Sequence, residues 1–479
     1  MSYRFQLSAQ AELLLSDGKT SNYGAQAIAQ RIAELTQMLD GLAPEVPIGL
    51  IGDNSPEWIL ADLAMLEAGR CAVPIPAFFT PEQVTHLVAA TGMTTVFHNG
   101  ALLPVGAVFP YLPASTPRSV VLPPLTQKIT FTSGTTGTPK GVCLTAGQQM
   151  ATVEGLAAVL GGLGIKRHLS LLPLAVLLEN IAGIYVPLML GAQCFVPPLA
   201  ETGLSGSSQF DAERCLNAIA QYQAESIILL PQMLQAIVWT AQVADPRLAT
   251  LKFVAVGGGV TPLAVLARAA EIGMPVYEGY GLSECASVVS LNTPSGNAVG
   301  SVGRTLPGVT ARIAADGEIE VQGRGYAGFL GDPVRPEASW IATGDLGTLD
   351  DNGFLRITGR KKNVLITSFG RNISPEWPER LLMESGMLAQ AVVIGDGQAH
   401  LSAVLVPRDK TVLEKDVAER VKKLNEHLPD YAQIAQWTLF SEGFTSKNGL
   451  STENGRPRRD AIAQKFLIND VKPQPIKES

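Results

Sequence analysis

The 479-residue sequence has few charged residues, no excess of basic charge and few aromatic side chains. Charged residues make up 16% of the chain and aromatic residues 6%, and the net charge is −7. This balance excludes a highly charged disordered chain and gives no electrostatic footprint for nucleic acid. Hydrophobic residues make up 46%, enough to build the core of a large globular protein. The composition therefore predicts a soluble, multidomain protein, most simply an enzyme.

Cysteine is scarce, and no CxxC pair or Cys/His cluster occurs. The odd number of cysteines and their wide spacing argue against a disulfide framework or a structural zinc site. Buried free thiols in a reducing, cytoplasmic environment are the simplest interpretation. The N-terminus lacks the basic segment, apolar run and cleavage site of a secretory signal, so we interpret it as mature protein. The cysteines are Cys71, Cys143, Cys194, Cys215 and Cys285.

Long uninterrupted hydrophobic runs are also missing. The most apolar segment, residues 169–199, is broken by Glu179 and Asn180 and carries Pro173 and Pro187. No stretch in it reaches the roughly 20 residues that a membrane helix needs. The segment therefore predicts a buried strand, turn and helix.

Charge density changes near residue 360. Residues 1–360 carry 19 basic and 28 acidic side chains, whereas residues 361–479 carry 17 and 15 in a third of that length. A small domain has more surface per residue, and hence more polar side chains, than a large one. We therefore expect a large N-terminal domain over 1–360 and a small, more polar C-terminal domain over 361–479.

Within residues 1–360, short apolar runs alternate with helical patterns. This alternation predicts layered α/β subdomains with parallel strands. Short strands with Gly/Asp turns over 310–360 predict a small β subdomain, and the Pro-rich stretch 101–127 reads as a loop-like connection. Expected strands lie at 46–51, 71–75, 226–230 and 253–256, and expected helices at 55–69 and from Thr80.

The strongest chemical signal is the segment ITFTSGTTGTPKG at residues 129–141. Its glycines allow backbone N–H groups to approach a polyphosphate, its hydroxyls add hydrogen bonds, and Lys140 supplies positive charge. It is not a Walker loop, because Pro139 and Gly141 flank the lysine where that motif requires Gly and Ser/Thr. The segment predicts a phosphate-binding loop of another type.

This loop resembles that of the adenylate-forming superfamily, which includes acyl-CoA ligases, luciferase and nonribosomal adenylation domains. Further segments resemble the family's motifs in the family's order, and those around residues 171–179 and 365–375 are closest to fatty acyl-CoA ligases. The resemblance covers most of the chain and implies the family's fold, with a small, mobile α+β C-terminal domain. The further motifs are YGLSE (280–284), GSVGR (300–304), TGD (343–345) and GRKK (359–362).

The family's reaction joins a carboxylate to Mg·ATP, giving an acyl-adenylate and pyrophosphate, and then passes the acyl group to a thiol. The resemblance implies that Glu284 coordinates Mg²⁺, that Ser283 contacts the α-phosphate, and that Asp345 and Arg360 bind the ribose. Tyr280 would pack on adenine. The backbone around adenine would come from Gly258, Gly259, Gly279 and Gly281. The β- and γ-phosphates would be held by Thr132, Ser133, Gly134, Thr135, Thr136, Gly137 and Lys140.

Two C-terminal positions also have implied roles. Lys362 lies where the family places the hinge between its two domains. The family's last catalytic lysine is replaced by Arg456 in TENGRPRR (452–459), and arginine is not interchangeable with lysine at a site of fixed geometry. We expect Arg456 to act in adenylation, with a neighbouring Lys447 or Lys465, or weak adenylation, as alternatives.

The acid and the acceptor are less specified. Val176 replaces a histidine of the fatty acyl-CoA ligase motif, and we assign Val176, Glu179 and Gly257 to the acid pocket. The apolar valine favours a hydrophobic carboxylate as substrate. The alternative is that Val176 only packs in the core. CoA is the expected acceptor, and a phosphopantetheinylated acyl carrier protein is the alternative. A third hypothesis is a nucleotide-binding protein with weak turnover, motivated by Arg456 and Ser283.

Overall fold

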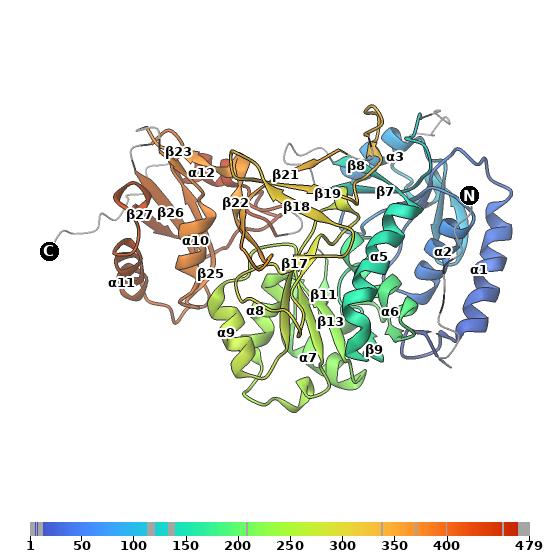
Figure 1. Cartoon of the computed structure of the whole chain (residues 1–479), viewed down its shortest axis with the longest axis horizontal. Helices are drawn as coiled ribbons and strands as arrows, with labels where there is room; N and C mark the ends of the chain where they lie inside the picture. Colours follow the sequence, from blue (N-terminus) through green and yellow to red (C-terminus); the bar gives the residue numbers. More distant parts are fainter. Residues whose placement is uncertain are drawn as a thin grey trace.

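The structure, a computed structural model, describes residues 5, 7, 13–112, 120–132, 139–206, 209–336, 339–368, 371–398, 400–452 and 455–467. Two large sheets, one four-stranded sheet and a short two-stranded hairpin form the N-terminal part, and a separate compact unit follows residue 360 (Figure 1). None of the helices in these ranges combines the length and apolar character needed to cross a bilayer.

The first large sheet has seven strands. Strand β3 pairs in parallel with β4 and β5, as the alternation of apolar runs and helices predicted. Along strand β8 (Lys140–Thr145), successive side chains point to opposite faces of the sheet and so enter two different cores. Val142 and Leu144 face one core, and Cys143 faces the other. In sheet order the strands are β20 (Gly328–Phe329), β8 (Lys140–Thr145), β7 (Thr126–Thr132), β4 (Ala72–Pro74), β3 (Ile48–Leu50), β5 (Thr95–His98) and β6 (Ala101–Pro104).

The second large sheet has nine strands, of which β13, β14 and β15 form a parallel centre. Its order is β17 (Arg304–Thr305), β16 (Ser290–Leu291), β15 (Val276–Tyr280), β14 (Phe253–Val256), β13 (Ser226–Leu229), β9 (Arg167–Leu169), β10 (Gln193–Phe195), β1 (Leu15–Ser16) and β2 (Asn22–Tyr23). Between β10 and β13 in the sequence, the chain forms a separate short antiparallel hairpin of β11 (Leu204–Ser205) and β12 (Gln209–Phe210).

Helices cover both sheets. Helix α2 begins after Ser55, whose side chain caps it with Pro56 at its first position, and α3 begins with a capping box at Thr80, both favoured helix starts. The helices of the N-terminal part are α1 (Ala25–Leu39), α2 (Pro56–Glu67), α3 (Pro81–Thr91), α4 (Val105–Val108), α5 (Ala146–Leu160), α6 (Val186–Met189), α7 (Ala212–Gln221), α8 (Pro231–Thr240) and α9 (Leu263–Glu271).

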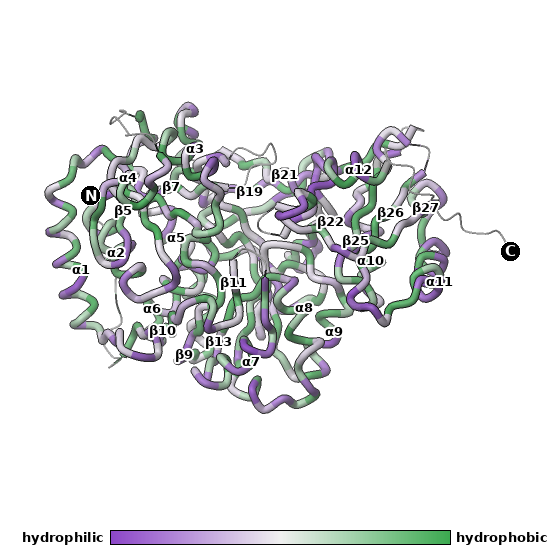
Figure 2. Tube along the Cα trace, turned by 180° about the vertical axis from the view of Figure 1, so that it is seen from behind, coloured by the Kyte–Doolittle hydropathy of each residue, from purple (hydrophilic) through white to green (hydrophobic). Residues whose placement is uncertain are grey.

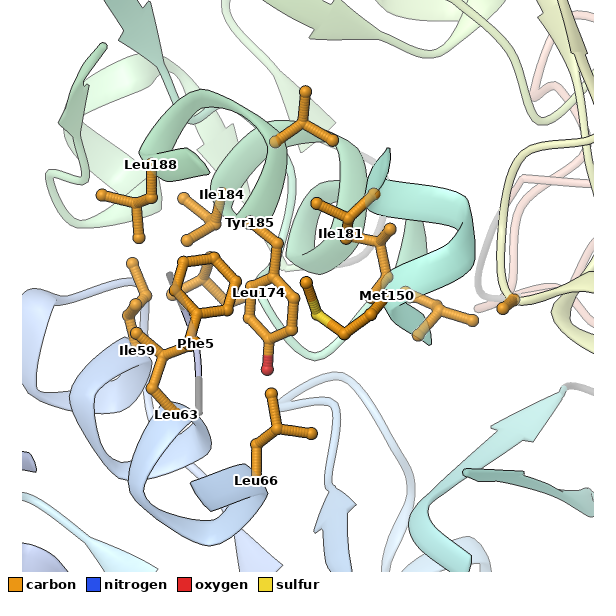
Figure 3. Close-up of a cluster of buried hydrophobic side chains, with 14 of the residues drawn as sticks. Phe5, Ile59, Leu63, Leu66, Met150, Leu174, Ile181, Ile184, Tyr185 and Leu188 are labelled. Atoms are coloured by element: carbon orange, nitrogen blue, oxygen red, sulfur yellow. The ribbon is translucent and has the colours of Figure 1, made fainter. Parts of the chain in front are cut away.

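The main core lies between the two sheets. It joins α1, α2 and α5 to the π-helix η2 (Glu179–Tyr185) and includes Phe5, whose ring meets Tyr185 edge-on at 5.2 Å (Figure 3). Separate cores lie under α3 and under α7, α8 and α9. The apolar segment 169–199 lies inside the core, as predicted, and runs from the last residue of β9 through a turn into a helix that is π over η2 and α over α6. The prediction missed strand β10, which follows the helix within the same segment.

One expectation was wrong. The stretch 101–127 is not simply a connection, because β6 pairs with β5 in an antiparallel hairpin and is followed by α4. Residues 113–119 of the stretch lie outside the described residues. Pro104 misled the sequence interpretation, yet it ends β6 at the edge of the sheet, where proline costs no ladder hydrogen bond.

The remaining strands form three smaller sheets. Residues 310–360 form an antiparallel sheet of β18 (Thr310–Ile313), β19 (Glu318–Gln322), β21 (Ile341–Leu349) and β22 (Leu355–Arg360). After it come β23 (Leu365–Ile366) and β24 (Asn372–Ile373), a three-stranded sheet of β25 (Leu388–Ile394), β26 (Leu401–Pro407) and β27 (Ile434–Leu439), and α10 (Glu376–Met383), α11 (Glu414–Asn425) and α12 (Arg459–Leu467).

The C-terminal unit has its own hydrophobic core. All buried apolar residues of its two clusters come from positions 365–462. Its outer helix α11 is strongly hydrophilic on the solvent side, where Figure 2 shows a band of polar residues. The molecule is therefore α/β with a large N-terminal part and a small α+β C-terminal part.

Candidate active site

The adjacent strands β21 and β22 bring an acidic and a basic residue together. Asp345 is the register partner of Arg360, and the Arg360 Nε lies 2.7 Å from Asp345 Oδ1. The hydroxyl of Tyr280, at the end of β15, donates to Asp345 Oδ2 at 2.6 Å. Three predicted nucleotide-binding residues from distant parts of the chain thus form one hydrogen-bonded group.

Burial sets the electrostatics of this group. Asp345 is only 3% exposed, and burial raises the pKa of its carboxyl, while Arg360 and Tyr280 act in the opposite direction. Burial likewise raises the pKa of the Tyr280 hydroxyl, and the neighbouring Asp345 charge adds to the effect. The carboxylate therefore depends on its two partners, and charge-assisted hydrogen bonds of this kind are short and strong.

Glu284 lies just beyond β15 in the 3-10 turn Ser283–Cys285, which also places Ser283. Burial raises the pKa of its carboxyl, and Arg360 opposes the shift. Among the described residues, this carboxylate has no ion-pair or side-chain hydrogen-bond partner, and its hydrogen bond is to its own backbone N–H. A half-buried carboxylate without a charged partner in contact is a fitting donor for Mg²⁺, a hard cation that takes oxygen ligands.

The backbone around Glu284 is under strain. Ala286 and Ser287 have positive φ angles of 52° and 94°, a conformation that costs free energy outside glycine and concentrates at functional sites. Gly281 is required for the same close packing, because a Cβ there would lie 1.6 Å from the carbonyl oxygen of Ser287. The turn that positions Glu284 is therefore sharply constrained.

A glycine turn follows β14 beside this group. A Cβ on Gly257 would lie 3.3 Å from the carbonyl oxygen of Gly279, and Gly258 has a φ of +82°. Gly259 continues the turn next to Pro231. Only glycines fit such close backbone approach together with a left-handed conformation. The turn leaves an open backbone surface, as expected for the edge of a base.

The phosphate loop connects two antiparallel strands. Thr132 ends β7 and Lys140 begins β8, and the two residues are register partners. The Lys140 Nζ lies 5.4 Å from the centre of the Phe329 ring. The other predicted loop residues, Ser133, Gly134, Thr135, Thr136 and Gly137, lie outside the described residues.

The C-terminal unit reaches the site through Arg456. Its Nη2 donates to the carbonyl oxygen of Gly258 at 3.1 Å, and its charge acts on Asp345. The alternative Lys465 lies over the rings of Phe440 and Phe466 in its own unit, with its Nζ 4.7 Å from the Phe440 centre. Of these two cations, Arg456 is the one that contacts the glycine turn beside Asp345 and Tyr280.

The predicted hinge residue Lys362 is exposed in the 3-10 turn that follows β22. Its neighbour Lys361 lies 2.6 Å from Asp316 Oδ2 and 2.7 Å from Glu318 Oε2. These two ion pairs fix the chain to the four-stranded sheet at Lys361, directly before it enters the C-terminal unit.

The predicted acid-pocket residues fall in two places: Gly257 lies in the glycine turn after β14, whereas Val176 and Glu179 lie just before and at the start of η2. Val176 is half-buried in the turn before η2, with its N–H donating to Pro173 O. Glu179 is fully buried, with Oε1 3.3 Å from His168 Nε2. The Nδ1 of the same histidine is 2.9 Å from Ser226 Oγ. The structure thus pairs Glu179 with a core histidine, while Val176 keeps one side accessible.

Sequence reasoning missed a second buried polar group beside η2. The Lys128 Nζ lies 2.9 Å from Asp62 Oδ2 and 2.5 Å from Asn180 Oδ1, and the Tyr185 hydroxyl donates to the same Asp62 oxygen at 2.7 Å. A lone lysine in the apolar strand TQKITFT and a lone aspartate in helix 56–67 were the available signals. Buried charges occur almost only in pairs, so each implied the other.

Comparisons with known proteins agree with this arrangement. A family model described as AMP-binding enzyme matches residues 10–330, and one described as AMP-binding enzyme C-terminal domain matches residues 362–469. A large part and a small C-terminal part that match these two models define the adenylate-forming class. The chain belongs to the AMP-binding enzyme family.

Curated relatives include a long-chain-fatty-acid–CoA ligase FadD15 of Mycobacterium tuberculosis, 31% identical over 40% of this chain. A methyl-dioxo-octahydro-indenyl-propanoyl:CoA ligase of the same organism is 27% identical over 82% of this chain and 84% of its own length. A 2-succinylbenzoate–CoA ligase of Bacillus cereus is 29% identical over 60% of this chain and 61% of its own. The match spans only 37% of the length of the FadD15 relative.

Solved structures share the fold over nearly the whole chain. ATP-bound MatB from Rhodopseudomonas palustris aligns with a TM-score of 0.78 at 19% identity, covering 98% of this chain and 100% of that one. The O-succinylbenzoate CoA synthetase MenE from Bacillus subtilis, in complex with ATP and magnesium, aligns with a TM-score of 0.74 at 20% identity, covering 94% and 96%. At such identities the likeness establishes the fold alone.

Proposed function

We propose that the protein is an AMP-forming acid–thiol ligase. The observation that carries this proposal is the meeting of Tyr280, Asp345 and Arg360 from the N-terminal part with Arg456 from the C-terminal unit. The first three offer a ring face and paired polar groups for a nucleoside, and the arginine adds a positive charge beside them. The relatives named as CoA ligases support the same reaction class.

In the proposed first step, a carboxylate oxygen of the acid attacks the α-phosphorus of ATP, and the bond to pyrophosphate breaks. Lys140 and Arg456 would balance the negative charge that develops on the phosphates. Glu284 would hold Mg²⁺, which shields phosphate charge when bound. The ribose hydroxyls would bind Asp345 and Arg360.

In the second step, a thiol sulfur attacks the acyl carbon of the adenylate and AMP leaves with the electron pair of the broken C–O bond. CoA is the proposed thiol, and a phosphopantetheinylated carrier protein is the alternative. The CoA ligase names of the relatives favour CoA. The hinge at Lys362 would let the C-terminal domain, 361–479, change its pose between the two steps.

The proposed acid is hydrophobic. Val176 offers an alkyl surface where the resembling motif has an imidazole, and the relative matched over most of this chain is named for a bulky ring-bearing propanoate. A cytoplasmic location fits the five cysteines, which are all buried free thiols in the structure.

A panel assay tests the proposal. The protein is incubated with Mg·ATP and aliphatic, aryl and amino acids, and pyrophosphate release is followed before CoA or a loaded carrier protein is added. We expect release with hydrophobic acids and thioester formation with CoA. If no acid causes pyrophosphate release, the enzyme assignment is overturned. If the thioester forms only with the carrier protein, the carrier protein and not CoA is the acceptor.

A further inference from the structure

Helix α8 turns one face away from its own core and toward the C-terminal unit. Gln235 and Trp239 are four residues apart and therefore lie on the same side of the helix. Trp239 is 40% exposed, an unusual position for the largest side chain. The opposite side of the helix is buried in the N-terminal part by Met233, Leu234, Ile237 and Val238.

The C-terminal unit supplies a matching surface. The Gln235 Nε2 donates to the carbonyl oxygen of Leu388 at 3.4 Å, and the Arg408 guanidinium lies 5.0 Å from the centre of the Trp239 ring. The ring also covers Gly386, where a Cβ would be only 2.8 Å from it. Figures 1 and 2 show α8 beside β25 and α10 from both sides.

These contacts come from one small part of the C-terminal unit. Gly386 ends the turn after α10 with a φ of +67°, and Leu388 begins β25. The backbone of Arg408, just past β26, donates to Met387 O at 2.8 Å, so the arginine lies beside the same turn. Position 386 requires glycine for two reasons: its backbone is left-handed, and the Trp239 ring packs where a side chain would be.

The same pose of the C-terminal unit brings Arg456 to Gly258 O. We propose that Gln235 and Trp239 form a docking face that holds the C-terminal domain in the adenylation pose, so that Trp239 is a positioning residue for adenylation and not for thioester formation. This inference rests on the proposed function. Within the described parts of the chain, Trp239 contacts neither Tyr280, Asp345 nor Arg360, and it acts through the position of Arg456.

The character of the contact suits reversible docking. One long hydrogen bond, one cation–π contact and one half-exposed ring are individually weak. Their separation would expose little apolar surface, because the ring is already partly in water. A domain that must leave this pose during each cycle requires such an interface rather than a continuous hydrophobic one.

Half-reactions test the proposal. In Trp239→Ala we expect ATP–pyrophosphate exchange to fall about fivefold, while thioester formation from a supplied acyl-adenylate stays within twofold of the parent. Trp239→Phe keeps a ring and should restore most of the exchange. Val243→Ala, three residues beyond the helix end and exposed, is the matched control and should change neither step. An equal fall in both steps would overturn the inference.

A double-mutant cycle isolates the contact itself. Gly386→Ala strains the backbone in any background, but it meets the indole ring only when Trp239 is present. We therefore expect the loss caused by Gly386→Ala to be smaller in the Trp239→Ala background than in the parent. Additive losses would show that the two residues do not interact and would contradict the docking face.

A distance measurement separates this inference from the proposed function. Spin labels at Ala270→Cys on α9 and Ala418→Cys on α11 report the pose without any turnover, and the five native cysteines are buried and spared. The parent should show one dominant short distance, which broadens or shifts in Trp239→Ala. Identical distributions would overturn the docking face even if the enzyme is active, whereas a shift in a protein that adenylates nothing would overturn only the ligase assignment.

Discussion

The N-terminal half of the proposed nucleotide site is built from short hydrogen bonds between strands, whereas the C-terminal half consists of one arginine on an exposed loop. Asp345 has two partners within 2.7 Å, both from the N-terminal part. Arg456 makes one bond of 3.1 Å, to a backbone oxygen. The first half is preorganised, and the second half depends on the pose of a domain.

This difference predicts that the N-terminal half binds the nucleotide and that the C-terminal half acts on the rate of adenylation. We expect the preorganised groups to hold the nucleotide in every pose of the C-terminal unit, because they belong to the N-terminal part. In the proposed cycle the positive charge of Arg456 is beside these groups only while the C-terminal unit is docked, so it would act in one step and be withdrawn for the next. Substitutions in the two halves should therefore have different signatures, and the following experiments test that difference.

Asp345→Ala should have the largest effect. It removes the proposed ribose acceptor and leaves Arg360 and Tyr280 without their shared partner, so we expect nucleotide affinity and pyrophosphate exchange to fall by about 100-fold or more. Isothermal titration with ATP and the exchange assay measure both quantities. Asp351→Ala, an exposed aspartate in the turn between the same two strands, is the control. A loss of less than threefold would contradict a preorganised half.

Arg456→Ala should come next, with a different signature. The proposed charge on the phosphates is lost only in the adenylation pose, so we expect exchange to fall about 10- to 100-fold, with ATP affinity changed less than threefold. Arg456→Lys should recover much of the rate, and Arg458→Ala, exposed two residues away, should be neutral. An equal loss of affinity and rate would mean that Arg456 belongs to the preorganised half.

The two halves also differ in how far the sequence predicted them. Tyr280, Asp345 and Arg360 could be named from motifs, and the fold then brings them together, with Tyr280 and Arg360 at strand ends and Asp345 within β21. The contact of Arg456 with Gly258 could not, since it depends on how two separately folded units dock, and the charge step at residue 360 says nothing about orientation. The docking face on α8 has no motif at all.

Core details were hidden for a related reason. The strands and helices around 48–91 followed from period and capping, and the structure has them within a few residues of the expected positions. The pairing of Glu179 with His168 joins the first residue of the π-helix η2 to strand β9. Such a contact depends on how a strand and a helix pack, so the periodicity of either element alone could not reveal it.

Lys361→Ala should have a smaller effect on the boundary between the halves. It removes the ties to Asp316 and Glu318 just before Lys362, but exposed ion pairs contribute only about 0–1 kcal/mol. We expect the ratio of the two half-reaction rates to change by no more than about fivefold, and less at high salt. Lys415→Ala on the outer surface of α11 is the control. A salt-independent change would rule out the electrostatic tether.

Glu278→Gln should change stability rather than rate, and only at high pH. Glu278, on β15, accepts a hydrogen bond from the Gly300 N–H at 3.1 Å, and burial raises the pKa of its carboxyl to about 7, with Arg356 and Arg380 of the two halves opposing the shift. The folded protein therefore holds this proton more tightly than the unfolded chain does. Its contribution is fully present below pH 4.5, the ordinary value, and is lost as the pH rises through about 7.

Glutamine cannot ionise, so the variant escapes this loss while keeping an oxygen for the Gly300 N–H. We expect equal melting temperatures near pH 5 and a variant more stable by a few degrees at pH 8, since the shift corresponds to at most about 3 kcal/mol. Glu271→Gln, exposed on α9, should show no such dependence. Arg380 comes from the C-terminal unit and Arg356 from the N-terminal part, so replacing each arginine by alanine in turn shows which of the two stabilises the Glu278 carboxylate more.

If the pKa of Glu278 rises more on loss of Arg356, its charge is set within the N-terminal part. If the pKa rises more on loss of Arg380, its charge depends on the docked C-terminal unit.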